Sequence, residues 1–342
     1  MLNEIRKAIE SANINFLIGA GLSRPFLDVL NNIETFLSDP TKTAREITDK
    51  KKEYFDKVML GNLAILDNAT NATKTEVLSN YKSFYKLLNN ILLKRENSLL
   101  SKQINIFTTN IDIFSEMALE ETGIEFNDGF HGRFQPIFHL GNFKKSYFSK
   151  SLHYENTSEI PVFNILKLHG SLTWKYNPSG DQIFLDQNLS SIRLIKENAT
   201  TSKFNKLYDR LVIVNPTKEK FKDTLLKQYY YDLLRIYSNE LEKENSLLFV
   251  LGCSFADEHI RDLTARVANS NPTLKIIIFS HDSPSSIYQQ MMDRAKNSNI
   301  QVMVPETGKK YDFKAINAEI LSKIVLQPQD LSGDPGITPT TL

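Results

Sequence analysis

Cysteine is almost absent from this chain of 342 residues, because Cys253 is the only one. A single cysteine forms no internal disulfide and supplies no paired CxxC motif for a structural zinc site. Disulfides accumulate in oxidising compartments, so the composition is typical of a protein from a reducing environment. It excludes disulfide-stapled scaffolds and cysteine-rich zinc modules.

A long apolar run and a charge of one sign are also missing. No stretch approaches the roughly 20 apolar residues that span a bilayer, and MLNEIRKAIESANINF lacks the apolar region of a secretory signal. The 41 basic and 40 acidic residues leave a formal charge of +1, which gives no overall field to attract nucleic acid. We expect a cytoplasmic protein without membrane contact. Direct nucleic-acid binding stays open, because assembly can create a basic channel.

Short apolar runs that end in small or polar residues recur along the chain. They are nearly continuous in β-forming residues, which is typical of strands buried on both faces of a parallel sheet. The runs are NINFLIGAGLS (13–23), INIFTTNID (104–112), VFNILKLHGS (162–171), RLVIVNPT (210–217), SLLFVLGCSFAD (246–257), TLKIIIFSHD (273–282) and IQVMVPE (300–306). The sequence therefore predicts an α/β fold with a Rossmann-like parallel sheet flanked by helices.

The segments between these runs have different patterns. From about 40 to 100, Leu, Tyr and Phe recur every three or four residues, which predicts a helical insertion that serves as a lid or as an oligomer interface. Residues 127–165 have weak periodicity and predict a loop-rich subdomain. We expect one catalytic domain over 1–326. The tail 327–342 has little to bury and is expected to be extended.

Polar residues at the ends of the first two runs are candidates for a ligand site, because ligands of open α/β sheets bind at the carboxyl ends of the strands. Gly19 and Gly21 would let the backbone approach a pyrophosphate at the start of a following helix, although a tight turn also explains them. Asn110 and Asp112 follow the second run. They would hold ribose hydroxyls or a carboxamide, or else cap the next helix.

Later runs carry further candidates. His169 ends the third strand next to a glycine, which leaves room for a ligand, although a lone histidine is often structural. Gly252 and Ser254 suit close backbone approach and a hydroxyl contact. Glu258 and His259 are either a catalytic pair or polar residues at a helix start.

Taken in order, the motifs GAGLS, TTNID, KLHGS, GCSFADEHI and IIIFSHD resemble the sirtuin superfamily, specifically the divergent bacterial sirtuin-like NADase branch found in anti-phage defence systems. The resemblance spans roughly residues 13–282. It implies that the first motif cradles the NAD phosphates through Gly19, Ala20, Gly21 and Ser23. It implies that the later motifs contact the cofactor through Thr109, Gly252 and Ser254.

The resemblance also implies the catalytic residues. Asn110 and Asp112 would bind the nicotinamide ribose and the carboxamide, and His169 would act as general base. His131, in the motif GFHGRF, is the second candidate for the base. We prefer His169 because it directly follows an apolar strand-like run.

Two departures from protein deacylases of this family shape the expected activity. The segment after the first motif reads RPFLDVL in place of their proline-, aspartate- and arginine-bearing one, and their four zinc cysteines are missing. We therefore expect no zinc and no deacylation. We expect an NAD glycohydrolase, with NAD as substrate, that depletes NAD during phage infection.

The resemblance makes self-assembly into a homo-oligomer and a co-encoded HerA-type ATPase the candidate means of control. Two other functions stay open. One is a non-catalytic sensor module for NAD or ADP-ribose, and the other is a nuclease-associated subunit.

Overall fold

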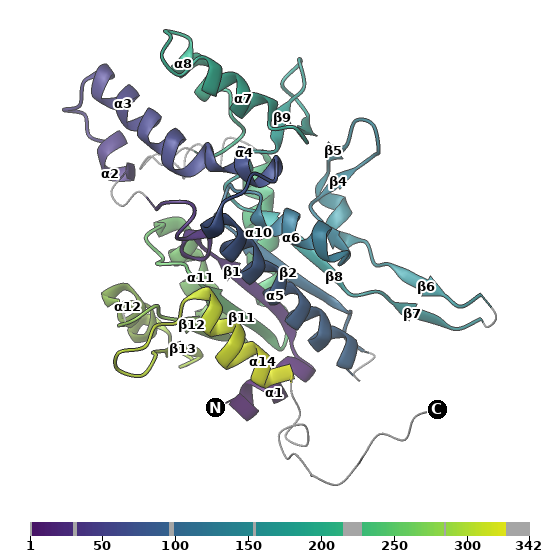
Figure 1. Cartoon of the computed structure of the whole chain (residues 1–342). Coiled ribbons are helices and arrows are strands. Elements are labelled where there is room, and N and C mark those ends of the chain that lie inside the picture. Colours follow the sequence, from purple (N-terminus) through teal and green to yellow (C-terminus); the bar gives the residue numbers. More distant parts are fainter. Residues whose placement is uncertain are drawn as a thin grey trace.

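A central parallel sheet with helices on both faces forms the body of the chain (Figure 1). The computed structural model describes residues 2–29, 33–95, 99–152, 155–214, 228–283 and 285–325, and every structural statement below refers to these ranges. None of the helices in them is both long and apolar enough to cross a membrane.

The main sheet has the strand order β13-β12-β11-β1-β2-β8-β3, and each neighbouring pair is parallel. Its strands are β1 (Asn13–Ile18), β2 (Gln103–Thr108), β3 (Phe126–Asn127), β8 (Val162–Lys167), β11 (Ser246–Leu251), β12 (Lys275–Phe279) and β13 (Ile300–Met303). The predicted Rossmann-like parallel sheet flanked by helices is confirmed. The two-residue edge strand β3 was not predicted.

Successive strand residues face opposite layers of the core, as the pleat requires. On β1, Phe16 packs into one apolar cluster and Leu17 into the other. The first layer holds α1 (Leu2–Ser11), α5 (Ala72–Lys94), α6 (Phe114–Thr122), the π-helix η4 (Ile316–Leu321) and α14 (Ser322–Val325). The second holds α10 (Gln228–Glu242), α11 (Glu258–Ser270) and α12 (Ser286–Arg294). Both faces of the sheet are therefore covered.

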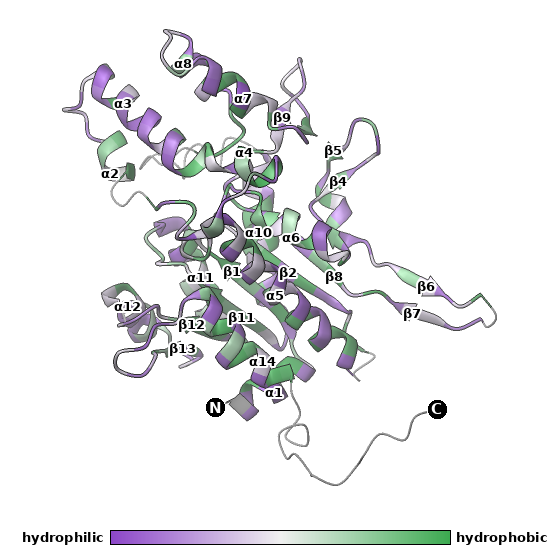
Figure 2. Cartoon of the chain, in the orientation of Figure 1, coloured by the Kyte–Doolittle hydropathy of each residue, from purple (hydrophilic) through white to green (hydrophobic). Residues whose placement is uncertain are grey.

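The helices expected between 40 and 100 divide into a core part and an outer part. Helix α5 belongs to the core, since the ring of Phe84 packs edge-on against Phe16 with centroids 5.2 Å apart. The outer part contains α3 (Ala44–Tyr54), the π-helix η2 (Phe55–Met59) and α4 (Gly61–Leu66). Helix α3 has no buried side chain and is largely hydrophilic (Figure 2). Helix α5 is thus part of the packed body, whereas α3 lies at its surface and meets the core through the half-buried Tyr54.

A second group of helices packs against α3. Helices α7 (Ser190–Glu197) and α8 (Phe204–Tyr208) follow the small sheet in the chain. Asn205 donates a hydrogen bond to the Thr48 hydroxyl at 2.7 Å, and the ring of Phe204 meets that of Phe55 at 6.1 Å. Together with α2 (Ile33–Leu37) and α4, these helices form an outer layer at the top of Figure 1.

The region predicted as a loop-rich subdomain contains short antiparallel strands and the 3-10 helix η3 (Leu140–Lys144). One sheet has the order β4-β5-β10-β9 and recruits strands from further along the chain. Its strands are β4 (Phe130–His131), β5 (Ile137–Phe138), β9 (Trp174–Tyr176) and β10 (Ile183–Leu185). A separate hairpin, β6 (Phe148–Lys150) and β7 (Thr157–Glu159), projects from the body (Figure 1).

Two local predictions were wrong. The expected helix directly after GAGLS is a single 3-10 turn, η1 (Ala20–Ser23). The Gly21 amide donates to the Gly252 carbonyl across the sheet edge, and Pro25 lacks the N–H that a continuing helix requires. The expected strand at 210–217 contributes only an isolated antiparallel bridge between Ile213 and Gly170. Residues 211–214 are buried as irregular chain, while 215–217 and the predicted tail lie outside the described ranges.

Four asparagines lie in register across neighbouring strands of the main sheet. Asn15 pairs with Asn105, Asn105 with Asn164, and Asn164 with Asn127. The Asn105 amide donates to the Asn15 side-chain oxygen at 2.9 Å, and the Asn164 amide donates to that of Asn105 at 2.9 Å. This asparagine row supplies partners for buried amides only in one register, so it opposes a slip of the strands.

We predict that Asn105→Ala lowers the free energy of unfolding by about 1–3 kcal/mol, because it removes partners from two buried amides. The double variant Asn105→Ala/Asn164→Ala should lose less than the sum of the two single variants, since the shared bond is lost once. Urea denaturation of the four proteins measures this coupling. Strictly additive losses would show that the row does not act as a unit.

Candidate functional site

The predicted motifs start from one edge of the sheet. Ile18 is in register with Thr108 on one side and with Leu251 on the other, and Thr108 is in register with Lys167. The strand order also reverses at β1, whose neighbours are β2 and β11. Ligands of doubly wound sheets bind at such a switch point, beyond the carboxyl ends of the strands.

The first glycine loop packs directly on the loop after β11. A Cβ on Gly19 would lie 2.5 Å from the carbonyl oxygen of Gly252, so the two backbones touch. The Gly19 amide donates a hydrogen bond to the Leu251 carbonyl at 2.9 Å, and the Gly21 amide donates one to the Gly252 carbonyl at 3.0 Å. Gly252 has φ 59°, a conformation that favours glycine. The glycines are therefore required by loop-to-loop packing, and two of the amides expected to face a phosphate are used inside the fold.

Ser23 connects this loop to the asparagine motif. Its hydroxyl donates to the Asp112 carboxylate at 2.7 Å and lies 3.1 Å from the Tyr81 hydroxyl. The Asn110 amide donates to the Gly19 carbonyl at 3.2 Å. Asp112 also accepts a hydrogen bond from the Phe114 amide at 3.2 Å. Asp112 thus makes the helix-start contact that had been the alternative to a site role, while its other oxygen joins the polar network.

Asn110 is the member of this network whose side-chain oxygen can still accept a hydrogen bond. Its backbone N–H donates to the Thr108 hydroxyl at 3.0 Å, and that hydroxyl donates to the Ile18 carbonyl at 2.9 Å. Asn110 is 6% exposed, and its side-chain oxygen accepts no hydrogen bond from any residue in the described ranges. A buried amide oxygen without a donor is uncommon in native proteins and points to a ligand group.

The charge of Asp112 acts on the tyrosines around it. Packing around the hydroxyl and then the Asp112 carboxylate raise the pKa of Tyr54 to about 12. Burial, with the same carboxylate adding to it, raises the pKa of Tyr81 well above its ordinary value. The tyrosines therefore stay protonated, so the hydroxyl groups around Asp112 are neutral and weakly solvated.

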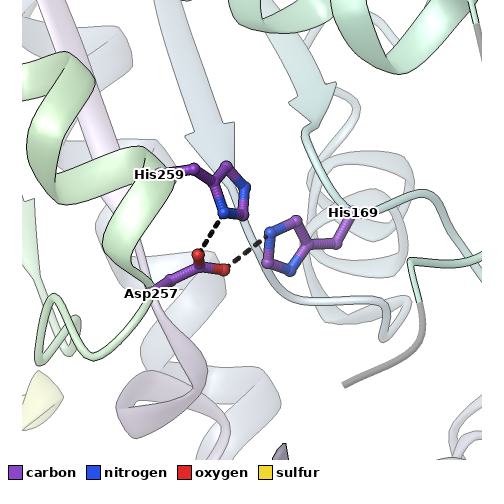
Figure 3. A group of neighbouring side chains, drawn as sticks. All are labelled: His169, Asp257 and His259. Carbon is purple, nitrogen blue, oxygen red and sulfur yellow. Dashed lines mark ion pairs between the residues drawn. The ribbon is translucent and has the colours of Figure 1, made fainter. Parts of the chain in front are cut away.

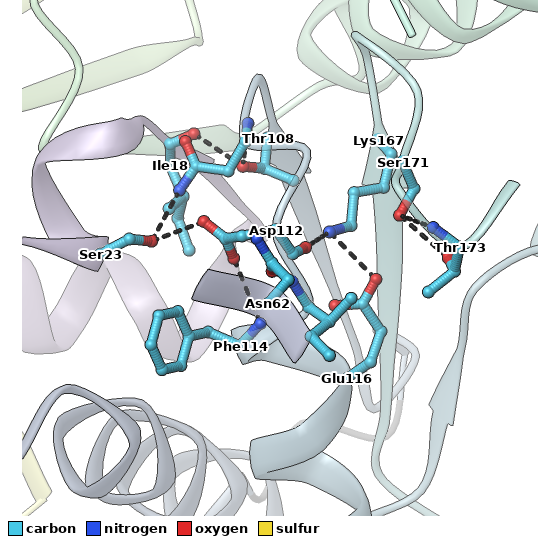
Figure 4. A network of polar contacts seen from close by, with 12 residues as sticks. Ile18, Ser23, Asn62, Thr108, Asp112, Phe114, Glu116, Lys167, Ser171 and Thr173 are labelled. Carbon is cyan, nitrogen blue, oxygen red and sulfur yellow. Dashed lines mark hydrogen bonds and ion pairs between the residues drawn. The ribbon is translucent and has the colours of Figure 1, made fainter. Parts of the chain in front are cut away.

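Lys167, the last residue of β8, ties two of the loops together. Its ammonium group donates to the Asp112 carbonyl and pairs with the Glu116 carboxylate at 3.0 Å (Figure 4). The Lys167 side chain is 4% exposed and that of Glu116 is 17% exposed. Burial raises the pKa of Glu116, and the charge of Lys167 counteracts that shift.

His169 lies in a second group, with Asp257 and His259 (Figure 3). Its Nε2 is 3.0 Å from Asp257 Oδ2, while His259 Nδ1 contacts the other carboxylate oxygen. The Val214 amide donates a hydrogen bond to the His169 carbonyl at 2.9 Å, and this bond holds the loop after β8 in place. One oxygen from Asp257 and one nitrogen from each ring all lie within 4.8 Å of one another, so these residues carry the donor atoms of a metal site.

Sequence reasoning did not identify Asp257, and it interpreted His259 mainly as a helix-start residue. The helix start itself is correct, since α11 begins at Glu258, whose side chain is 81% exposed. The available signal was the spacing Asp-x-His directly after a strand end. That spacing places two polar side chains in the turn after β11, at the sheet edge where a ligand is expected to bind.

The other predicted residues take less central positions. The Thr109 amide donates a hydrogen bond to the Ile18 carbonyl at 3.3 Å. Ala20 and Ser254 are exposed at the sheet edge. The Ser254 hydroxyl accepts a hydrogen bond from Ala256 at 3.4 Å. His131 is exposed on β4, in the small antiparallel sheet.

Comparison with protein families matches residues 104–303, which is more than half of the chain, to the SIR2-like domain. The chain belongs to the SIR2-like family. The matched range includes Asn110, His169 and Gly252, and the predicted sirtuin superfamily is confirmed. Family membership supports an NAD-related activity of the sirtuin type.

Two solved structures are similar to this SIR2-like chain. The first is a Sir2 histidine-to-tyrosine mutant with a p53 peptide and NAD, at 12% identity and TM-score 0.46, covering 94% of this chain and 98% of that one. The second is a Sir2 histidine-to-alanine mutant with a deacetylated p53 peptide and 3′-O-acetyl ADP-ribose, at 13% identity and TM-score 0.42, covering 95% and 99%. No curated protein matches the sequence.

We predict that Lys167→Met lowers the free energy of unfolding by about 3–5 kcal/mol, because it leaves Glu116 buried without its cation. The pKa of Glu116 in the folded chain is raised above its ordinary value of 4.5. The folded state therefore favours the protonated acid, and the variant should lose further stability as the pH rises above about 4.5. Urea denaturation across this pH range measures both effects. The double variant Lys167→Met/Glu116→Gln should recover most of the loss, and equal losses in the two variants would contradict the role of the ion pair.

We predict that Cys253 reacts slowly with iodoacetamide in the native protein. Burial, with the Asp257 charge adding to it, raises the pKa of this thiol to about 11. At pH 8 only roughly a thousandth of the thiol is then the reactive thiolate, and the fraction grows as the pH rises. Mass spectrometry of timed samples measures the rate. Labelling at pH 8 as fast as in the denatured chain would contradict the raised pKa.

Proposed function

We propose that this chain is an NAD glycohydrolase, which cleaves the bond between nicotinamide and ribose to give nicotinamide and ADP-ribose. We propose further that it acts in the cytoplasm as an anti-phage effector that depletes NAD. The observation that carries the activity is the buried side-chain oxygen of Asn110, which accepts no hydrogen bond from the described residues although it lies at the polar sheet edge of a SIR2-like fold. That oxygen suits a ribose hydroxyl or the attacking water.

The electrostatics of the site suit this reaction. The nicotinamide ring of NAD is cationic and leaves as a neutral group, so positive charge passes to the ribose in the transition state. A carboxylate held in a weakly solvated site stabilises such charge, and it needs no reorganisation when Ser23 and the Phe114 amide already fix it. Asp112 takes this role in our proposal.

Water completes the cleavage. It forms a bond to the ribose carbon as the bond to nicotinamide breaks, and it gives up one proton. His169, on the loop next to the asparagine motif, accepts that proton or one from a ribose hydroxyl. The exposed edge formed by Ala20, Gly21 and Ser254 is where we place the NAD phosphates, with Gly19, Ser23, Thr109 and Gly252 shaping the turns beneath them.

Nicotinamide release from NAD by the purified protein tests the proposal. Asn110→Ala should lower the rate by about 100–1,000-fold, through loss of a positioned polar group. His169→Ala should lower it by about 100–10,000-fold, through loss of a general base. His131→Ala is the matched control. It should retain the wild-type rate, because His131 lies exposed on the small sheet.

The same assay separates the rival functions. NAD that binds without nicotinamide release, under every condition tried, would identify a sensor module in place of an enzyme. A rate that falls in His131→Ala and not in His169→Ala would move the base to His131.

Control of the activity is a further part of the proposal. A NAD-depleting enzyme harms its own cell unless it is held off, so we propose a homo-oligomer and a co-encoded HerA-type ATPase as the means. Light scattering and the nicotinamide assay, each with and without that partner, measure this. A monomer that is equally active in both cases would contradict it.

A further inference from the structure

The cluster of His169, Asp257 and His259 brings donor atoms together from two separate loops. His169 follows β8, whereas Asp257 and His259 stand at the start of α11 after β11 (Figure 3). The side chains are 10%, 16% and 7% exposed. Three donors shielded to this extent, and arriving from loops far apart in the sequence, are arranged by the fold itself.

The Asp257 carboxylate faces the two histidines and does not cap its own helix. It is the N-cap residue of α11, yet its side chain makes no capping hydrogen bond. An aspartate cap contributes typically about 1 kcal/mol to a helix, so this contribution is forgone. One carboxylate oxygen lies 3.0 Å from His169 Nε2, and the other contacts His259 Nδ1. The carboxylate is therefore directed at the two imidazoles.

The donor set selects a class of ligand. Two imidazole nitrogens and one carboxylate oxygen suit Zn²⁺ and related transition metals, whereas Mg²⁺ and Ca²⁺ prefer oxygen ligands alone. Three protein ligands with one open position are the usual arrangement of a reactive zinc site. Tetrahedral bonds of about 2.0–2.1 Å place ligand atoms roughly 3.3 Å apart. The donor atoms of the cluster already lie within 4.8 Å of one another, which is close to that spacing.

We propose that His169 Nε2, His259 Nδ1 and the Asp257 carboxylate form a binding site for a divalent transition metal, with Zn²⁺ as the best fit. The site shares no ligand type with a four-cysteine zinc site, and it uses a residue that the proposed function assigns as a base. Metal on Nε2 engages that nitrogen's lone pair. If the proposed function holds, bound Zn²⁺ therefore inhibits nicotinamide release.

Metal binding is measured without NAD, so its outcome is independent of the proposed function. The full chain is stripped with a chelator and titrated with Co²⁺, whose visible absorption reports low-symmetry coordination, and Zn²⁺ is then added to displace it. We expect one Co²⁺ per chain, displacement by one equivalent of Zn²⁺, and no displacement by a hundredfold excess of Mg²⁺. Zn²⁺ should also raise the melting temperature.

Variants locate the site. Asp257→Ala and His259→Ala should each weaken Co²⁺ binding by more than the roughly 10–100-fold that outer-shell changes cost. His281→Ala is the matched control and should bind as the wild type does. His281 also neighbours an aspartate, Asp282, at 3.6 Å, but both side chains are more than half exposed, and they form no three-residue cluster with any other described residue.

Circular dichroism confirms that each variant folds, and Asp257→Asn and His259→Gln replace any alanine variant that does not. Absence of saturable Co²⁺ and Zn²⁺ binding by the wild type would overturn the proposal, as would equal binding by the wild type and all folded cluster variants. Loss of binding in His281→Ala alone would place the metal elsewhere and overturn it as well. Stoichiometric binding with no nicotinamide release would leave the metal site standing and reject only the proposed function.

Discussion

Hydrogen bonds between asparagine side chains hold the neighbouring strands β1, β2 and β8 in one register, and the candidate site depends on that register. Asn15, Asn105 and Asn164 bond to one another across these strands, and Asn127 of β3 lies in register beside Asn164. A slip of one residue would leave these buried amides without hydrogen-bond partners and would turn every side chain of the strand to the opposite face of the sheet. Because the register is fixed, Ile18, Thr108 and Lys167 end level with one another. The polar loops that follow them then meet at one edge.

Much of this could be predicted from sequence, because the signals are local. Apart from β3, each strand of the main sheet is a short apolar run, and Asn110 and His169 each follow one of these runs, so the edge that carries them follows from the parallel arrangement alone. The asparagine row was not predicted. Asn15, Asn105 and Asn164 are single polar residues inside apolar runs, Asn127 lies outside any such run, and the partner of each lies on another strand. Pairing of this kind has no signature within a window of sequence.

The failures share that cause. The turn after β1 was expected to lead into a helix, but its shape is set by the contact between Gly21 and Gly252, which are far apart in the chain. The apolar run near Ile213 is buried without joining the sheet, and an apolar pattern alone does not distinguish these outcomes. Asp257 and His259 become candidate metal ligands only because the fold brings His169 next to them. In each case a contact between distant segments outweighs the local pattern.

Lys167 has a mechanical consequence for the site. It lies two residues before His169 in the chain, while its ammonium group holds the carbonyl of Asp112 and the carboxylate of Glu116. A force that moves one of these loops is therefore transmitted to the other. Helix α3 has no fully buried side chain and meets the core through the half-buried Tyr54, so it offers less resistance to displacement than the buried strands do.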